Sequence, residues 1–182
     1  MSEITSIYHL LDEAGLWTRH RTLKRGEYLM LPGHRDRDLY YVESGTLAAT
    51  VIIDGEEQYV RFGYAGDIVA AVDTLVGGEV SILGIKGLRR SELRIASYAD
   101  YRALMQADPR GRLAWEQSMD WLIQGQLERE IDLLTPSPEE RYRRVLGRSP
   151  RLFQEVPLRY IANYLRMTPE TLSRIRSHRR KS

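Results

Sequence analysis

Basic side chains near the C-terminal end are the residues of this sequence best suited to bind a partner. Residues 168–181 place Leu172 and Ile175 at helical spacing, so both can face inward on one side of a helix. The other sides carry polar and basic residues, and the basic ones are Arg174, Arg176, Arg179, Arg180 and Lys181. A helix with so much charge of one sign can neutralise the phosphates of a nucleic acid.

Local signals predict a second short helix directly before this one. Pro157 suits a first helical turn, because its missing N–H has no partner there anyway. Thr168 and Pro169 then provide an N-cap and a first helical residue for the following helix. The apolar stripe of the first helix consists of Leu158, Ile161, Ala162 and Leu165. Two helices that cross at a tight turn can present the second one to the major groove of DNA.

Charge is strongly segregated along the chain. Residues 141–182 contain 12 Arg or Lys and two acids, a net charge of +10, whereas residues 1–140 contain 15 bases and 23 acids, a net charge of −8. The overall charge of +2 therefore conceals a dipolar chain. This asymmetry favours a polyanionic partner at the basic end over a merely solvated basic tail.

The region before residue 107 is predicted to be rich in short β-strands. A short amphipathic helix over residues 6–14 comes first. Glycine-containing turns, including a hairpin signal at Asp54-Gly55, separate the strand candidates that follow. These candidates are residues 28–31, 39–43, 46–53, 58–62, 81–85 and 91–95. Many short strands at regular spacing indicate a sandwich or barrel.

A long helix is predicted over residues 108–134, between Asp108-Pro109 and the prolines at 136 and 138. At 1.5 Å per residue it is about 40 Å long, more than one small domain can cover. Its apolar stripe therefore predicts a second copy as partner, although packing on its own β-domain alone is the alternative. The residues expected at the dimer contact are Trp115, Met119, Leu122 and Gln126.

Two sequence patterns resemble the Crp/Fnr family of bacterial transcription regulators. Ile161-Ala162-Asn163-Tyr164-Leu165 and Glu170-Thr171-Leu172-Ser173-Arg174 match the family's IAxxL and ETxSR helix-turn-helix patterns. The KxGExLxxPG and YYVExGxL patterns near the N-terminal end resemble the family's cyclic-nucleotide-binding β-roll. The resemblance covers nearly the whole chain.

The resemblance implies an α+β fold with three parts. A double-stranded β-helix or jelly-roll sensor domain is expected over residues 1–107, and a helix over residues 108–134 that pairs with its copy in a parallel dimer. A helix-turn-helix domain is expected over residues 135–182. The β-hairpin wing that usually follows the second helix in the family is expected to be absent.

The resemblance also implies which side chains contact DNA. The family's base-contacting Glu, Ser and Arg fall on Glu170, Ser173 and Arg174, whose chemistry suits cytosine N4, several bases, and guanine O6 and N7 respectively. The corresponding half-site is TTGA-like. The residues expected on the phosphates are Thr168, Thr171, Arg176, Arg179, Arg180 and Lys181.

The ligand-binding cassette of the family is degenerate in this sequence. The family's Glu position holds Ala71, or Asp73 if the register shifts, and its Arg position falls at or near Ser81. Gly78 belongs to the same stretch, where Glu79 would repel a phosphate. An anionic phosphate would lose its charge-assisted hydrogen bonds there, so we expect no binding of cAMP or cGMP. The pocket then either takes another small-molecule effector or is simply packed.

Composition excludes several other classes of function. The sequence has no Cys, which rules out disulfides, Cys-based zinc sites and iron–sulfur clusters. Its four His are scattered, and no catalytic spacing stands out, so we expect no enzyme, no metal and no cofactor. No apolar run is long enough to span a membrane, and no signal peptide is evident, which predicts a cytoplasmic protein. The expected partners are double-stranded DNA and a second copy. A sensor that acts through protein contacts is the competing hypothesis.

Overall fold

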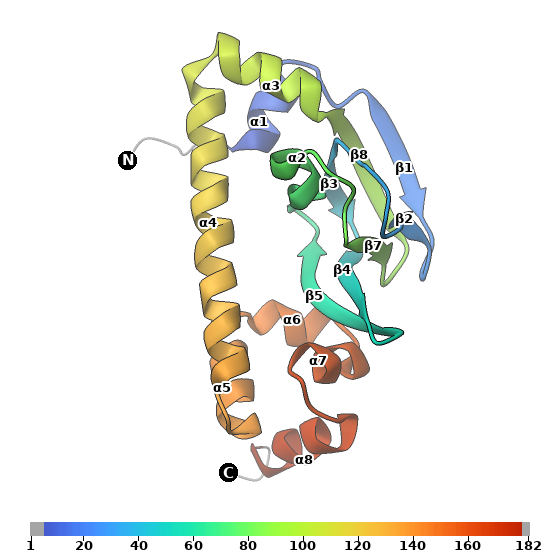
Figure 1. Ribbon diagram of the computed structural model, residues 1–182, viewed down its shortest axis with the longest axis vertical. Helices are drawn as coiled ribbons and strands as arrows, with labels where there is room; N and C mark the ends of the chain where they lie inside the picture. The colour runs from blue at the N-terminus through green and yellow to red at the C-terminus, as the bar shows by residue number, and fades with distance from the viewer. Residues whose placement is uncertain (1–5, 180–182) are drawn as a thin grey trace.

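The computed structural model describes residues 6–179, and the side chains up to residue 178. Two four-stranded antiparallel sheets form its β-domain (Figure 1). The first has the order β1 (Arg19–Leu23), β8 (Ser91–Ser97), β3 (Asp38–Ser44), β6 (Ile68–Val69). The second has the order β2 (Tyr28–Met30), β7 (Gly84–Gly87), β4 (Thr46–Ile53), β5 (Glu56–Tyr64). The predicted α+β fold with a jelly-roll domain is confirmed.

Alternation along the strands explains why the two sheets pack face to face. Val42, Leu47 and Leu93 are almost completely buried between the sheets, while their neighbours along each strand point to the opposite face of the sheet. The hairpin between β4 and β5 turns at Asp54 and Gly55, which both have a positive φ (53° and 78°). Asp and Gly adopt a positive φ more readily than other residues, which explains why this pair stands at the predicted hairpin turn.

One predicted strand has the wrong bounds, because a tertiary contact removes its first residues from the sheet. The strand expected over residues 81–85 begins at Gly84 instead, because Ser81 and Ile82 hydrogen-bond to Asp73 at the start of a short helix, α2 (Val72–Gly77). Strand β1 has no counterpart among the predictions. It is an edge strand of mostly polar residues, in which only Leu23 is buried.

The long helix α4 (Pro109–Leu134) has the bounds that the sequence predicts, with the Asp108 carboxylate accepting from the Arg110 N–H as its N-cap. It runs beside the β-domain and continues to the C-terminal helices (Figure 1). Helices α1 (Ile7–Glu13) and α3 (Tyr98–Ala107) pack with its first turns around Tyr101. No helix in the described part of the chain is long and apolar enough to cross a membrane.

As far as residue 179, the C-terminal domain consists of four short helices: α5 (Pro138–Arg148), α6 (Pro150–Glu155), α7 (Leu158–Tyr164) and α8 (Pro169–Arg179). Their core contains Ile161, Leu165 and Leu172, each with no exposed surface, whereas Leu158 of the predicted stripe is 40% exposed. The same core includes Ala48 and Tyr59 from strands β4 and β5. The C-terminal helices are therefore packed directly on the second sheet.

Candidate DNA-binding face

The turn between α7 and α8 follows from its local sequence. Arg166 adopts a left-handed conformation (φ 54°), which ends α7 and redirects the chain. The Thr168 hydroxyl then accepts from the Thr171 N–H at 3.2 Å, and Pro169 begins α8. The predicted helix start at Thr168 is confirmed.

Helix α8 has one buried side and one open side. Leu172 is completely buried and Ile175 is 8% exposed, so both anchor the helix on the domain core. Glu170, Ser173 and Arg174, at relative positions 0, 3 and 4, share the exposed side. Their side chains make no hydrogen bond or ion pair with the rest of the described chain. The structure therefore brings the three predicted base-contacting residues together on one free surface.

The predicted phosphate-contacting residues are only partly described. Thr171 and Arg176 are half-buried on α8, and Thr168 is exposed with its hydroxyl engaged in the helix cap. The Arg179 side chain and the whole of Arg180 and Lys181 lie outside the described part.

The net charge of +10 overstates how much basic surface is free. Four of the counted arginines form ion pairs with carboxylates: Arg143, Arg144, Arg148 and Arg151. Arg141 is buried, with its guanidinium donating to the carbonyls of Leu165 (2.8 Å) and Arg166 (3.4 Å). Much of the basic charge thus builds the domain, whereas Arg174 and Arg176 of α8 have no carboxylate partner among the described residues and are available to a polyanion.

A charge network fixes the angle between α4 and α5. The completely buried Asp132 of α4 accepts from Arg144 at 3.2 Å and from Arg148 at 2.5 Å. Glu128, one turn earlier, pairs with the same two arginines at 3.0 and 3.3 Å. Burial lowers the pKa of Arg148, but its hydrogen bond to Asp132 and the negative charges of Asp132 and Glu128 together outweigh that effect, and the pKa is raised overall. Both arginines join α5 to the carboxylates of α4 and hold the two helices together.

The residues expected at the dimer contact of α4 differ in how much of each is exposed. Trp115 contacts the rings of Tyr98 and Tyr101, and Met119 and Leu122 are half-buried. Gln126 is exposed but not apolar. The exposed apolar residues on the opposite side are Leu113, Ile123, Leu127, Ile131 and Leu134. This outward stripe is available to a partner, whereas Trp115 already belongs to its own domain.

The predicted ligand cassette forms a closed hydrogen-bond network. The Asp73 carboxylate accepts from the Ser81 hydroxyl at 2.9 Å, from the Ile82 N–H at 3.1 Å and from the Thr74 N–H at 3.0 Å. Ala71 lies in the core between the sheets, and Gly78 ends α2 with a φ of 75°. A carboxylate of the chain itself therefore uses the donors of this loop.

Sequence reasoning missed the arginines that the fold brings near this loop. Arg35 lies 3.8 Å from Glu79, and the Arg37 guanidinium lies 3.7 Å from the position that a Cβ on Gly78 would take. Both come from the segment before β3, some 40 residues earlier in the chain, so only the tertiary structure shows them. Both are exposed, and Arg35 already has a carboxylate partner.

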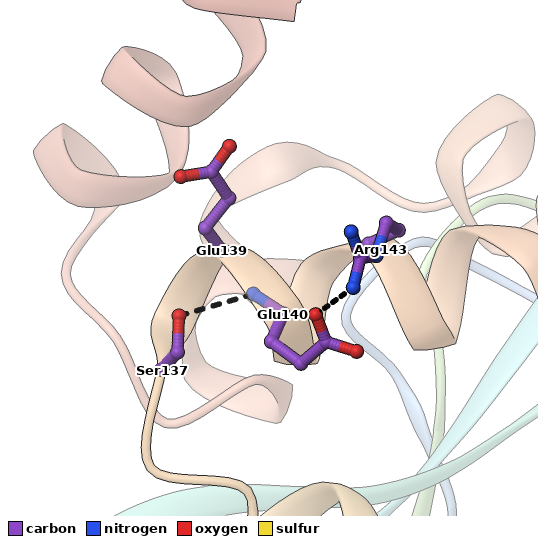
Figure 2. A pocket seen from close by; sticks show the side chains of 4 residues that line it. All are labelled: Ser137, Glu139, Glu140 and Arg143. Carbon is purple, nitrogen blue, oxygen red and sulfur yellow. Dashed lines mark hydrogen bonds and ion pairs between the residues drawn. The ribbon is translucent and has the colours of Figure 1, made fainter.

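A hollow at the start of α5 has a purely local explanation (Figure 2). Ser137 caps the helix by accepting from the Glu140 N–H at 3.3 Å, and the Glu140 side chain pairs with Arg143. Glu139 completes the lining. These interactions close within a single helix and its cap, and the two carboxylates make the hollow unsuitable for a phosphate.

Comparison with known proteins agrees with this architecture. Residues 20–108 match the model of the cyclic nucleotide-binding domain. The fumarate and nitrate reduction regulatory protein of Vibrio cholerae is 30% identical, over 90% of this chain and 70% of the relative. This chain belongs to the Crp/Fnr family of DNA-binding transcription regulators.

Solved structures of this family have the same fold as the present regulator. FixK2 from Bradyrhizobium japonicum superimposes with a TM-score of 0.71 at 19% identity, over 88% of this chain and 83% of the other. A CooA structure from Carboxydothermus hydrogenoformans gives a TM-score of 0.76 at 16% identity, over 97% and 85% of the two chains. The helix-turn-helix of the regulator is α7 and α8.

The matching domain model is named for cyclic-nucleotide binding, but the side chains of this Crp/Fnr regulator at the predicted cassette are not suited to bind a cyclic nucleotide. Ala71 offers no acceptor for a ribose hydroxyl, and Ser81 carries no positive charge for a phosphate. The Asp73 carboxylate holds the Ser81 hydroxyl and would repel a second anion at that position.

Proposed function

We propose that this regulator binds a palindromic DNA site as a homodimer, with Glu170, Ser173 and Arg174 on base edges. The observation that carries the proposal is the free surface that these three side chains share on α8. An arginine there can fork onto guanine, and the glutamate can accept from cytosine N4. The proposed parts are a sensor over residues 1–107, a dimer helix over 108–134 and a DNA-binding domain over 135–182, acting in the cytoplasm and without catalysis.

Contacts to the DNA backbone are proposed for the remaining polar side of α8 and for the residues after it. Arg176 and the basic side chains of Arg179, Arg180 and Lys181 would neutralise phosphates, and Thr168 and Thr171 would contact the backbone at the helix start. Such contacts add affinity and salt dependence but no sequence preference.

The proposed dimer contact is the outward stripe of α4 rather than the face around Trp115. Leu113, Leu127 and Leu134 are separated by multiples of seven residues, the repeat of a two-stranded coiled coil. All three are exposed, by 54%, 58% and 73%, and burying such surface favours association. A two-fold axis along α4 would place two copies of α8 about one DNA turn apart.

We further propose that DNA binding does not require cAMP. The network around Asp73 supports this, because the loop is already ordered by an internal carboxylate. A different small-molecule effector is compatible with the same network only at another location on the sensor.

Titration of a labelled duplex tests the proposed function. A duplex with an inverted TTGA repeat should bind at least about a thousandfold more tightly than a scrambled duplex, at the lower end of the usual range of specificity ratios. Added cAMP should leave both affinities unchanged. Arg174→Ala should remove most of the preference, whereas Arg112→Ala, an exposed arginine of α4, should not. Equal affinity for both duplexes, or loss of binding without cAMP, would contradict the proposal.

A further inference from the structure

The turn of the helix-turn-helix is held by three separate elements, and the first is an edge strand of the sensor. The Asn163 side chain accepts from the Tyr59 N–H at 2.9 Å and donates to the Glu57 carbonyl at 3.3 Å. Both backbone groups belong to β5, which is the last strand of its sheet. The carboxamide therefore continues the backbone pairing of the sheet and ties α7 to it.

The second element is the dimer helix. Arg129 of α4, only 8% exposed, donates to the carbonyl of Tyr164, the last residue of α7, and its guanidinium lies 3.7 Å from the Tyr164 ring. Burial lowers the pKa of Arg129, and within residues 6–178 no carboxylate lies within ion-pair distance of it. The negative end of α7 and the ring face are thus its compensating partners.

The third element is α5, and it completes the enclosure of the turn. Arg141 binds the next two carbonyls, those of Leu165 and Arg166. The Arg166 side chain extends back to the sensor and donates to the Gln58 side chain at 2.7 Å. Every residue from 163 to 166 is consequently fixed by a contact from outside α7 and α8.

The reading surface remains open in this arrangement. Glu170, Ser173 and Arg174 are exposed and have no contact of their side chains with the sensor, although α7 is fully docked. A docked state that covered these residues would oppose DNA binding. Because docking leaves them free, the docked orientation is one in which α8 can read DNA.

We propose that Arg129 and Asn163 are positioning residues that set the angle of α8 relative to the dimer helix and the sensor sheet. The turn of residues 163–166 is then the point at which a change in either element reaches the DNA-reading surface. This inference rests on the proposed function, since it assumes that α8 reads DNA from the docked position.

Two variants separate positioning from simple stability. Asn163→Ala removes both bonds to β5, and Arg129→Met keeps the aliphatic bulk but removes the guanidinium. One nitrogen of that guanidinium, Nη1, is buried without a hydrogen-bond partner among the described residues, so Arg129→Met can remain well folded. Gln154→Ala, exposed on α6, and Arg112→Met, exposed on α4, are the matched controls.

Each variant should bind the specific duplex about tenfold more weakly, because about 1.4 kcal/mol of net hydrogen bonding no longer favours the docked orientation. The two losses should not add in the double variant, since both contacts fix one turn. The thermal midpoint of each single variant should stay within a few degrees of the parent, and the controls should match the parent in affinity.

A second measurement is independent of DNA. The sequence has no Cys, so Arg25→Cys on the sensor and Ser177→Cys on α8 provide two defined spin-label positions. In excess unlabelled protein, the distance between the labels should be narrowly distributed in the parent and broad in Asn163→Ala and Arg129→Met.

The outcomes are distinguishable. Unchanged distance distributions, or undiminished DNA affinity in folded variants, would overturn the positioning role while leaving the proposed function intact. If the parent shows no preference for the palindrome, the proposed function fails. A narrow distribution of label distances that broadens in both variants would still establish that Arg129 and Asn163 position α8.

Discussion

Arginines in the C-terminal domain divide into two kinds by their surroundings. Arg141 is buried and binds backbone carbonyls of the helix-turn-helix turn, whereas Arg174 on α8 is exposed and has no side-chain partner among the described residues. A buried cation that satisfies helix-end carbonyls is structural, and an exposed cation on a free helix face is available for recognition. Residue type alone does not separate the two kinds, because both lie in the same basic stretch of sequence.

Arg141→Ala should destabilise the C-terminal domain by about 2–3 kcal/mol, because the carbonyls of Leu165 and Arg166 would stay buried without their donor. Arg143→Ala, two residues later, removes an exposed pair with Glu140 and should cost less than about 0.5 kcal/mol. Urea denaturation of the two variants measures the difference. Equal destabilisation would show that Arg141 does not hold the turn.

Arg174→Ala and Arg176→Ala should have different effects on DNA binding. Loss of Arg174 should cost about 1–3 kcal/mol on the specific duplex and relax the preference at one base position. Loss of Arg176 should weaken binding to every duplex alike. The slope of log affinity against log salt concentration should become shallower by about 1, the value for one lost phosphate contact. Titrations at several salt concentrations distinguish the two outcomes. A change of base preference in Arg176→Ala would reverse the assignment.

At the scale of elements, local signals succeed where an element's bounds depend on its own residues. Helix α4 begins at Pro109 and ends before Pro136, as the N-cap and proline signals predict, and Thr168 caps the start of α8 as predicted. The start of strand β7 is predicted too early, because the Asp73 carboxylate, eight residues before Ser81, accepts from the Ser81 hydroxyl and the Ile82 N–H and keeps both residues out of the strand. The sequence pattern carries no trace of that contact.

The candidate site shows the same limit. The spacing of Glu170, Ser173 and Arg174 against Leu172 and Ile175 predicts which side of α8 is exposed. The face of α4 that contacts the β-domain depends on where the domain lies, and apolar residues occur around most of the helix. Likewise, the sequence cannot show which arginines pair with buried acids such as Asp132, because those contacts join different helices.

One residue of α4 distinguishes the two possible dimer faces. Asp120 occupies the seven-residue repeat between Leu113 and Leu127, so the proposed dimer would place two carboxylates opposite each other. Asp120→Leu should therefore tighten the dimer by about tenfold or more, because it replaces like charges with apolar contact. Gln126→Leu, on the face first predicted from the sequence, should leave the dimer unchanged. Sedimentation equilibrium measures the dimer dissociation constants of both variants. If only Gln126→Leu tightened the dimer, the contact would lie on the face around Trp115 instead.

At the scale of the whole molecule, the β-domain and the C-terminal helices share one packed core. Ala48, Tyr59 and Leu88 of the β-domain lie in the same cluster as Ile161 and Leu172 of the helix-turn-helix. Helix α4 runs alongside both and supplies the outward stripe for a partner. In the proposed dimer, the entire fold would therefore place α8 relative to the two-fold axis, and the spacing between two half-sites would be a property of that dimer.

Selection of bound duplexes from a random DNA pool, without any nucleotide, tests this account most directly. The account predicts enrichment of an inverted repeat whose half-sites are centred about 10 base pairs apart, with a G·C pair at the position contacted by Arg174. It also predicts that the Arg174→Ala protein enriches the repeat with that position relaxed. Enrichment of no motif, or of a single half-site without its inverted copy, would contradict the account.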